Sequence, residues 1–350
     1  MDNSSQRKIL RVSPACEIPQ LAGEITSALV GDGPSLGFGE ITSEFAAHYA
    51  AVVIGTSGSS GSPKEVALTA TALISSARAS NKFINAKPGE TWSLLLPLTH
   101  IAAVNVIIRA IELGTLPIDL RNHEGEYPKA NYTSIVPTQL FRALNGDVRL
   151  LNHLKSAKTV LVGGAALSQS LRNQAELAGI KVITTYGMTE TCGGCVYDGE
   201  VLDGVEVEIR NGKINIRGPI LASSISLDAG WYETSDLGEF KNDKLIVLGR
   251  ADDVIISGGE NLSLNAVEAS LSAAFVDVEF AAFSIEDPQW GDSLQIAVVG
   301  TVSDEELVAR LESDLGSFAK PKGIHRLTSL PLLGIGKVDR KSLAKGVAHE

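Results

Sequence analysis

The sequence predicts an α/β protein built in three consecutive parts: a layered core, a β-rich subdomain and a small α+β unit. In the first part, apolar β-branched runs alternate with helical patterns, which is typical of a largely parallel sheet covered by helices. Hairpin patterns follow, and from Ala251 helices alternate with strands again. We therefore expect an N-terminal domain over residues 1–250, with the β-rich subdomain at about 198–250, and a C-terminal α+β domain over residues 251–350.

The core elements are predicted by short apolar runs and by the residues that end them. "AAVVIG" (50–55) stops at a glycine and indicates a buried strand. The alanine-rich spacing of "LTATALISSARASNKFI" predicts a helix capped by Thr69 or Thr71, and "AAVNVIIRAIELG" predicts a helix that ends at Gly114. Further buried strands are expected at the start of "TWSLLLPL", "TSIVPTQLFRAL", "TVLVGGAAL" and "KVITTYGM".

The later parts have their own local signals. "GVEVEIRNGKINIRGP" alternates apolar and polar residues around Asn-Gly, the strongest short hairpin signal, and "GEFKNDKLIVLGR" repeats the alternation around "NDK". After a boundary at "GRADD", helices are predicted in "NAVEASLSAAF" and "SDEELVARLESDL", and strands in "VEFAAFSI" and "LQIAVVG".

Composition excludes several classes of protein. The chain has 350 residues, 44% hydrophobic and 20% charged, which indicates a substantial core, and its net charge of -11 disfavours binding to nucleic acids or anionic membranes. No long apolar segment follows "MDNSSQRKIL", so no secretory signal is expected. Pro97, His100, Asn105 and Arg109 interrupt the most apolar stretch, so no membrane span is expected. Three cysteines cannot all pair within the chain, which fits a reducing cytoplasm.

The stretch "GTSGSSGSPKEV" (55–66) is either a linker or a loop that holds phosphate. It is no Walker A motif, because Ser62 and Pro63 separate Gly61 from Lys64 and Glu65 stands where Ser or Thr is needed. Its glycines, hydroxyls and lysine are nevertheless the parts of an anion cradle. Its position directly after a buried strand favours the cradle over the linker.

A second candidate site follows a later strand, in "TYGMTETCGG" (185–194). Thr189 and Glu190 would lie at the carboxyl edge of the sheet, where ligands bind in open α/β folds, and a lone carboxylate there could hold Mg²⁺ together with substrate phosphates. The alternative is a solvated surface glutamate. A single Cys192-x-x-Cys195 is weak evidence for zinc or redox chemistry, so we expect a close-packed loop beside a ligand.

Four further residues are candidates for ligand binding, and each also has an ordinary structural or surface role as the alternative. "WYETSDLGEF" places Asp236 at a turn between strands, where it could accept ribose hydroxyls or close an Asx-turn. Arg250 offers a second phosphate or ribose donor beside a flexible joint. Lys337 lies in a glycine-flanked loop and would otherwise be a surface lysine, and His100 is a pocket residue or a core or cap histidine.

Five stretches, in their order and spacing, closely resemble the adenylate-forming superfamily of acyl-CoA synthetases. They are "TSGSSGSPKEV", "TYGMTE", "YETSD", "GRADDVIISGGENLSLNAVE" and "GIGKVDR". The resemblance runs from about residue 50 to the C-terminus. Within the superfamily, "YGMTETCGGCVYDG" and "LDGVEVEI" are most similar to the o-succinylbenzoate–CoA ligases of menaquinone biosynthesis. Members usually carry a longer N-terminal portion, so we expect a shortened form.

The resemblance implies a large N-terminal domain of mixed sheets layered with helices, a mobile C-terminal domain, and a set of ligand contacts. Thr189 would contact the α-phosphate of ATP, Glu190 would hold Mg²⁺, and Lys337 would bridge the acid's carboxylate and the α-phosphate. The β- and γ-phosphates would be wrapped by Thr56, Ser57, Gly58, Ser59, Ser60 and Gly61 with Lys64, and the nucleoside would be bound by Gly163, Gly164, Tyr186 (stacked on the adenine), Gly187, Asp236 (on the ribose) and Arg250.

The same resemblance implies where the acid and coenzyme A bind. Asp252 would be the hinge, Ser257, Gly258 and Gly259 would line the pantetheine passage, and His100, Gly193 and Gly194 would lie near the acyl pocket. The sequence departs from the superfamily in three places, with Ser235 for the usual glycine, Asn265 for the usual proline, and Thr99 and Ala103 where His and Gly are expected.

The resemblance implies an ATP-dependent acid–CoA ligase that uses ATP, Mg²⁺ and coenzyme A and has no tightly bound prosthetic group. The expected acid is o-succinylbenzoate, and the alternative is another aryl or acyl acid. A non-catalytic nucleotide-binding relative is disfavoured because Lys64, Glu190, Asp236 and Lys337 are all retained. The assembly stays open between a monomer and a homodimer.

Overall fold

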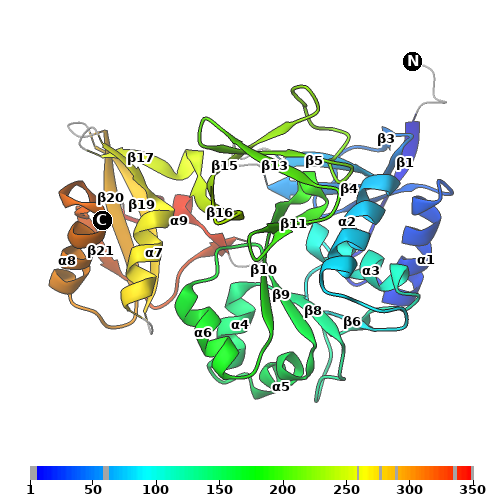
Figure 1. Cartoon of the computed structure of the whole chain (residues 1–350), viewed down its shortest axis with the longest axis horizontal. Helices are drawn as coiled ribbons and strands as arrows, with labels where there is room; N and C mark the ends of the chain where they lie inside the picture. The colour runs from blue at the N-terminus through cyan, green and yellow to red at the C-terminus, as the bar shows by residue number, and fades with distance from the viewer. Residues whose placement is uncertain are drawn as a thin grey trace.

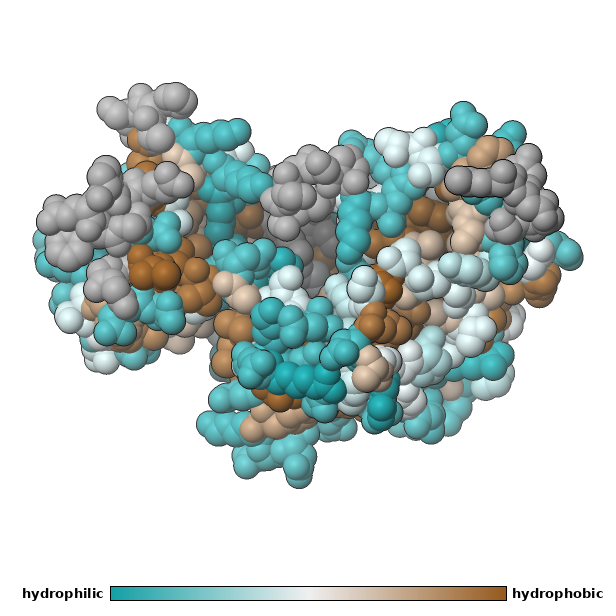
Figure 2. Space-filling view, turned by 90° about the horizontal axis from the view of Figure 1, so that it is seen from above, coloured by the Kyte–Doolittle hydropathy of each residue, from teal (hydrophilic) through white to brown (hydrophobic). Residues whose placement is uncertain are grey.

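The computed structural model of the chain describes residues 6–57, 63–257, 260–275, 278–287, 291–333 and 337–347. Two lobes stand side by side, a larger one up to about residue 250 and a smaller one after it (Figure 1). Seen from above, the described surface is mostly hydrophilic with smaller hydrophobic patches (Figure 2). None of the helices in these ranges combines the length and apolar character that crossing a membrane requires.

The first sheet holds the strands on either side of the Gly/Ser loop. Its order is β3-β1-β2-β4-β5, in which β1, β2 and β4 are parallel and β5 is antiparallel to β4. The strands are β1 (Gln6–Arg11), β2 (Ser35–Phe38), β3 (Phe45–Ala47), β4 (Ala50–Ser57) and β5 (Pro63–Thr69). The strand at "AAVVIG" is confirmed, but β5 was not predicted. The loop therefore joins two antiparallel strands and does not lead directly into a helix.

The second sheet is the largely parallel one that the sequence predicts. Its order is β12-β11-β10-β9-β8-β6-β7, with parallel pairing from β7 to β10 and antiparallel pairing at β11 and β12. The strands are β6 (Trp92–Leu94), β7 (Ile118–Asp119), β8 (Tyr132–Ile135), β9 (Thr159–Val162), β10 (Val182–Met188), β11 (Gly193–Tyr197) and β12 (Glu200–Val201). The expected loop around Cys195 is wrong, because residues 193–197 pair with β10 as a strand.

Helices cover these sheets and share their cores. Thr69 caps α2, as one of the two predicted caps, with its side-chain oxygen accepting from Ala72 N at 3.1 Å. α3 is buried along most of its length and contacts α1, α2, β6, β8 and β11, so it lies between the second sheet and the helices α1 and α2. The helices are α1 (Ile18–Leu29), α2 (Ala70–Phe83), α3 (Ile101–Glu112), α4 (Pro137–Leu144), α5 (Val148–Ser156) and α6 (Gln169–Leu177).

The β-rich subdomain is an antiparallel sheet in the order β13-β14-β15-β16. Its strands are β13 (Glu206–Arg210), β14 (Lys213–Arg217), β15 (Tyr232–Lys241) and β16 (Lys244–Arg250). Both predicted hairpins are confirmed, and the first turns at Asn211 and Gly212, whose φ angles of 50° and 78° suit a tight hairpin turn. The expectation that Asp236 lies at a turn is wrong, because it lies within β15 opposite Arg250 on β16.

The last hundred residues form an α+β unit with its own hydrophobic core, which includes Ile255, Leu271 and Leu294. The predicted helices and strands are all present, in a sheet of β18-β17-β20-β19 with β21 beside β20, and a ribbon of β22 and β23. The elements are η3 (Ala251–Asp253), β17 (Val254–Ser257), β18 (Glu260–Ser263), α7 (Leu264–Ala274), β19 (Glu279–Asp287), β20 (Gly291–Val299), α8 (Asp304–Leu315), η4 (Ser317–Ala319), β21 (Gly323–Arg326), β22 (Leu332–Leu333), β23 (Lys337–Val338) and α9 (Arg340–Val347).

Candidate active site

A tyrosine and an aspartate from different sheets meet near the carboxyl end of β10. Tyr186 on β10 donates from Oη to Oδ2 of Asp236 on β15 at 2.7 Å. Burial, and next the Asp236 carboxylate, raise the pKa of Tyr186 above its usual value, so the phenol stays protonated and continues to donate. The structure thus brings together the residues that the resemblance assigns to the adenine and the ribose.

Tyr232 is a neighbour of this pair that the sequence reasoning missed. Burial, and next the Glu190 and Asp236 carboxylates, raise its pKa to about 12, although Arg250 works to lower it. The phenol therefore lies within the field of both candidate ligand-binding carboxylates. Period-two spacing could have found it, because residues 232 and 236 lie on the same face of β15.

Lys64 and Glu190 form an ion pair, although 126 positions separate them in the chain. Lys64 Nζ lies 3.4 Å from Glu190 Oε1, and the two side chains are 54% and 17% exposed. The pairing of β4 with β5 places Lys64 opposite Thr56, whose Oγ1 donates to the Lys64 carbonyl at 3.0 Å. The loop strands and the second sheet therefore converge on one side chain, Glu190.

Glu190 has the properties of a carboxylate that shares a metal ion with a substrate. It lies in η2 (Thr189–Thr191), directly after β10, with Thr189 beside it. Across the described ranges, no group of three or more His, Cys, Asp and Glu side chains is arranged to hold a metal. Glu190 alone suits Mg²⁺, which usually binds one or two carboxylates and takes its other ligands from phosphates and water.

Arg250 and Asp252 form a bidentate ion pair at the end of the β-rich subdomain. Arg250 Nε donates to Asp252 Oδ1 at 2.7 Å, and Nη2 donates to Oδ2 at 2.8 Å. The guanidinium of the expected ribose or phosphate donor is thus turned toward the expected hinge residue. Arg250 still lies opposite Asp236 in the ladder of β15 and β16.

Three glycines of the site are required by close packing. A Cβ on Gly163 would lie 2.3 Å from Thr185 Oγ1, and one on Gly187 would lie 2.0 Å from the Gly193 carbonyl oxygen. A Cβ on Gly194 would lie 2.7 Å from a ring carbon of Tyr197. These clashes explain the glycines as packing positions in β10 and β11 and in the turn after β9.

Beneath β11, α3 places a buried arginine that the sequence reasoning did not assign. Arg109 is 4% exposed, and its Nη2 donates to Tyr197 Oη at 3.0 Å while Nη1 donates to Ser134 Oγ at 3.4 Å. Its guanidinium lies over the Trp92 ring, 5.2 Å from the centroid, and its Nε finds no hydrogen-bond partner in the described part of the chain. None of the ion pairs formed within the described ranges includes Arg109. The only signal in the sequence was an arginine inside an apolar helix.

Two cysteines are buried close to Arg109, at the start of β11. Cys192 and Cys195 are buried, and burial raises both pKa values above the usual one, that of Cys195 to about 12. The Cys192 carbonyl accepts hydrogen bonds from Ser76 Oγ at 2.9 Å and from Asn105 Nδ2. These contacts fix the backbone just before Gly193, one helical turn along α3 from Arg109.

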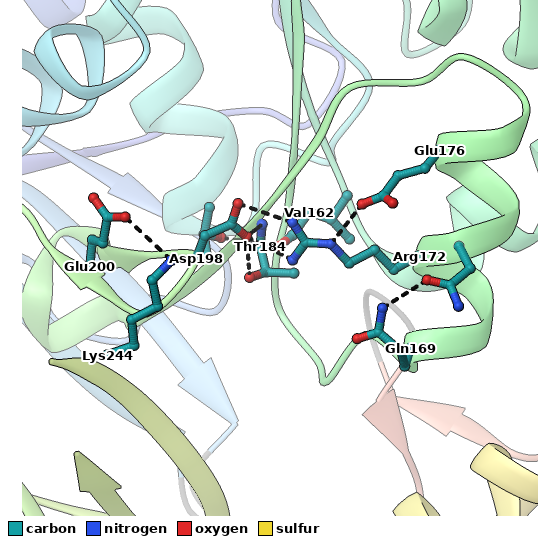
Figure 3. A network of polar contacts seen from close by, with 10 residues as sticks. Val162, Gln169, Arg172, Glu176, Thr184, Asp198, Glu200 and Lys244 are labelled. Carbon is teal, nitrogen blue, oxygen red and sulfur yellow. Dashed lines mark hydrogen bonds and ion pairs between the residues drawn. The ribbon is translucent and has the colours of Figure 1, made fainter. Parts of the chain in front are cut away.

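A second polar network fastens α6 to the strand that carries Tyr186 (Figure 3). Asp198 accepts from Arg172 Nη1 and Nη2 at 3.0 and 3.2 Å, and from Thr184 N and Oγ1 at 2.9 and 2.8 Å. Burial works to raise the pKa of Asp198, but the hydrogen bonds from Arg172 and Thr184 outweigh it and lower the pKa. Because the turn with Gly163 and Gly164 leads into α6, this network also holds one end of that turn.

Several predicted residues lie elsewhere or outside the described ranges. His100 precedes α3 as its N-cap residue, without a side-chain cap bond. Lys337 begins β23 and pairs with Leu333 in the smaller lobe, and Ser257 ends β17 opposite Glu260. The positions outside the described residues are Gly58, Ser59, Ser60, Gly61, Gly258 and Gly259.

Comparison with known proteins identifies the family. The model of the family described as "AMP-binding enzyme" matches residues 24–220. A "Probable 2-succinylbenzoate--CoA ligase" of Mycobacterium tuberculosis is 38% identical over 331 residues, covering 86% of this chain and 85% of that protein. The 2-succinylbenzoate–CoA ligase of Escherichia coli is 30% identical over 316 residues, covering 84% and 68%.

The solved structures agree with this result. The structure of wild-type Escherichia coli MenE with a bound analogue of OSB-AMS is similar with a TM-score of 0.71 and 26% identity, covering 98% of this chain and 83% of that one. A Bacillus subtilis MenE complex, at 24% identity and a TM-score of 0.74, has the same fold. The chain therefore belongs to the family of AMP-binding enzymes.

Proposed function

We propose that this chain is an AMP-forming acid–CoA ligase whose acid is 2-succinylbenzoate, acting in menaquinone biosynthesis. The names of its relatives support the acid and coenzyme A as substrates, and the Bacillus subtilis MenE structure in complex with ATP and magnesium ion supports ATP. The observation that carries the choice of acid is Arg109, a buried cation that has no acidic partner among the described residues and donates to Tyr197 on β11, the strand that begins with Gly193 and Gly194. Three unpaired cysteines support a reducing compartment, the cytoplasm.

The chemistry requires that two anions approach each other. A carboxylate oxygen of the acid attacks the α-phosphorus of ATP, diphosphate leaves, and an acyl adenylate forms. Lys64 and Lys337 stabilise the negative charge around the phosphates, and Glu190 would hold a Mg²⁺ that would supply further positive charge there. The thiol of coenzyme A then attacks the acyl carbonyl carbon, and AMP leaves. The Tyr186–Asp236 pair binds the nucleoside throughout.

The proposed substrate has one carboxylate to be activated and a second that must be bound. Burying an arginine without a countercharge is costly, and truncating one partner of a buried, hydrogen-bonded charge pair costs several kcal/mol. We assign Arg109 to the second carboxylate, because its Nε is unsatisfied and its neighbours Tyr197, Ser134 and Trp92 are uncharged.

This assignment predicts a selective loss in Arg109→Met. We expect kcat/KM for 2-succinylbenzoate to fall at least about 30-fold, since a buried charge pair is lost. For 3-benzoylpropanoate, which lacks the ring carboxylate, kcat/KM should hardly change. Arg149→Met is the matched control, because Arg149 also stacks on an aromatic ring, that of Tyr127. Equal losses for both acids would show that Arg109 is structural.

The reaction class has its own test. The wild-type protein with ATP, coenzyme A and a panel of carboxylic acids should release AMP and diphosphate, most rapidly with 2-succinylbenzoate. If another aryl or acyl acid reacts most rapidly, the ligase activity is supported and that acid replaces 2-succinylbenzoate as the proposed substrate. Release of ADP, or no turnover with any acid, would contradict the proposal.

We further propose that the chain divides into domains 1–250 and 251–350 and that the second rotates about Asp252 between half-reactions. The separate core of the smaller lobe supports the division. The position of Asp252 in the short η3 between β16 and β17 supports the hinge. Rotation would let Lys337 serve adenylation and Ser257–Gly259 serve thioester formation in turn.

A further inference from the structure

The junction of the two lobes contains a close contact between Gly249 on β16 and Asn265 in the first turn of α7. A Cβ on Gly249 would lie 2.4 Å from Asn265 Nδ2 and 3.0 Å from Asn265 Cβ. The amide of Asn265 therefore occupies the space that a side chain at residue 249 would need. This contact lies one residue before Arg250, whose ladder partner is Asp236.

The other end of the Asn265 amide contacts the segment that follows Lys337. Arg340, at the start of α9, donates from Nη2 to Asn265 Oδ1 at 3.2 Å and to Glu268 Oε1 at 2.9 Å. The same guanidinium pairs with Asp253 in η3 at 3.5 Å and donates from Nε to the Ala282 carbonyl at 2.8 Å. Asn265 thus lies between the end of β16 and the residues just after the proposed catalytic lysine.

These contacts of Asn265 with Gly249 and Arg340 are formed in a structure whose Lys337 segment faces the larger lobe. The ribbon of β22 and β23 reaches toward α6 of the larger lobe (Figures 1 and 3). Asn265 and Arg340 both belong to the smaller lobe, whereas Gly249 belongs to the larger one. A rotation about Asp252 would break the contact between Asn265 and Gly249 but preserve the bond between Asn265 and Arg340.

We propose that Asn265 is a positioning residue that holds the smaller lobe in the adenylate-forming arrangement. Asn265 packs against Gly249 and orients Arg340, and Arg340 in turn positions the segment that contains Lys337. Proline, which the superfamily usually carries here, has neither the Oδ1 acceptor nor the amide that fills the space over Gly249. This inference rests on the proposed function for its catalytic consequence, but the contact itself can be tested without substrate.

Asn265→Ala is the informative variant. Alanine suits a first helical turn, and the N-cap Ser263, which accepts from Ala266 N, is untouched, so the fold is retained. We expect pyrophosphate exchange with 2-succinylbenzoate to fall about 10-fold, the scale of one hydrogen bond to a charged group. Conversion of supplied acyl adenylate to thioester should be unchanged or faster. Asn265→Asp, which keeps the Oδ1 acceptor and the shape, should restore most of the exchange.

The control is Asn152→Ala, which removes an exposed asparagine from α5, far from the junction. A second readout is hydrogen exchange of backbone amides in residues 247–253 of the free protein, which should be faster in Asn265→Ala than in the wild type. Equal loss of both half-reactions, or unchanged exchange of these amides, would overturn the inference. If the wild type shows no turnover but the amides still exchange faster in Asn265→Ala, only the proposed function is contradicted.

Discussion

Tyr186, Tyr232 and Asp236 show how single residues acquire a function from their surroundings. Two phenols whose pKa values are raised by burial and by carboxylates stay protonated across the physiological pH range. They can therefore act as hydrogen-bonding groups or stacking surfaces, and not as phenolate bases. Asp236 receives one donor from Tyr186 and keeps its remaining acceptor capacity for a ligand such as a ribose.

Glu65 is a second residue whose environment decides its role. Burial works to raise its pKa, but hydrogen bonds from Ser43 and Thr42 outweigh burial and lower the pKa to about 2. Its Oε1 accepts from Thr42 N at 2.6 Å and from Ser43 N at 3.0 Å. Glu65 therefore ties the strand that carries Lys64 to the loop before β3, in the position where a Walker motif would have Ser or Thr.

The lowered pKa predicts a pH dependence of stability. The charged form of Glu65 is favoured in the folded state, so its contribution is fully present above the ordinary pKa of 4.5 and is lost as the pH falls toward 2. In urea unfolding, wild type should be more stable than Glu65→Gln at neutral pH, and the difference should shrink below about pH 4.5. A difference that stays constant with pH would show that the charge is not involved.

At the scale of elements, the network around Asp198 connects α6, β10 and the turn after β11. Asp198 itself has a φ of 46°, so the turn it occupies is held in the left-handed region while its carboxylate reaches back to Thr184. This arrangement fixes the start of the strand whose end carries Tyr186. It also holds α6, the helix that follows Gly163 and Gly164.

The variant Asp198→Asn tests whether this network stabilises the fold and whether it also positions the ATP site. Loss of the partly buried, bidentate pair with Arg172 should lower the free energy of unfolding by about 1–2 kcal/mol. Because the turn at Gly163 loses an anchor, KM for ATP should rise more than kcat falls. A double-mutant cycle with Arg172→Met measures the pair itself, and a coupling energy near zero would contradict the clamp.

At the scale of the whole molecule, the two lobes have separate cores and meet at the short η3 and at α7, which contacts β16. The residues of the proposed adenylation site come from both lobes, with Glu190 and Asp236 in the larger and Lys337 in the smaller. The proposed mechanism requires Lys337 and the Ser257–Gly259 segment, which both belong to the smaller lobe, to act on the same acyl group in successive half-reactions. Motion between lobes is therefore part of the proposed mechanism.

This mechanism predicts opposite effects of two variants. Lys337→Ala should lose pyrophosphate exchange and still convert supplied acyl adenylate to thioester, because its charge acts only in adenylation. Asp252→Pro should keep adenylation and impair thioester formation, because the hinge can no longer turn. Lys345→Ala, at an exposed site on α9, is the control for the first variant. Equal loss of both half-reactions in Lys337→Ala, or normal turnover in Asp252→Pro, would count against these roles.

Local signals in the sequence determined most of the elements of this protein. Asn211-Gly212 predicted a hairpin because Asn and Gly adopt a positive φ at little energetic cost. Thr69 predicted the start of a helix because its hydroxyl can accept a hydrogen bond from a backbone N–H of the first turn. The order of five motifs likewise identified the superfamily and the expected ligand-binding residues. In contrast, β5 was hidden, because the proline, lysine and glutamate that open "PKEVALT" break the apolar pattern, and the segment is a strand through its pairing with β4.

Only the tertiary structure decided which distant side chains meet. Arg109 and Tyr197 are 88 positions apart, and Arg340 and Asn265 are 75 positions apart. No periodicity within one segment records such a pairing, because it depends on how sheets and helices pack together. For the same reason Asn265 appeared in the sequence as a mere departure from a motif. In the fold, it packs against Gly249 of the larger lobe and accepts a hydrogen bond from Arg340 of the smaller lobe.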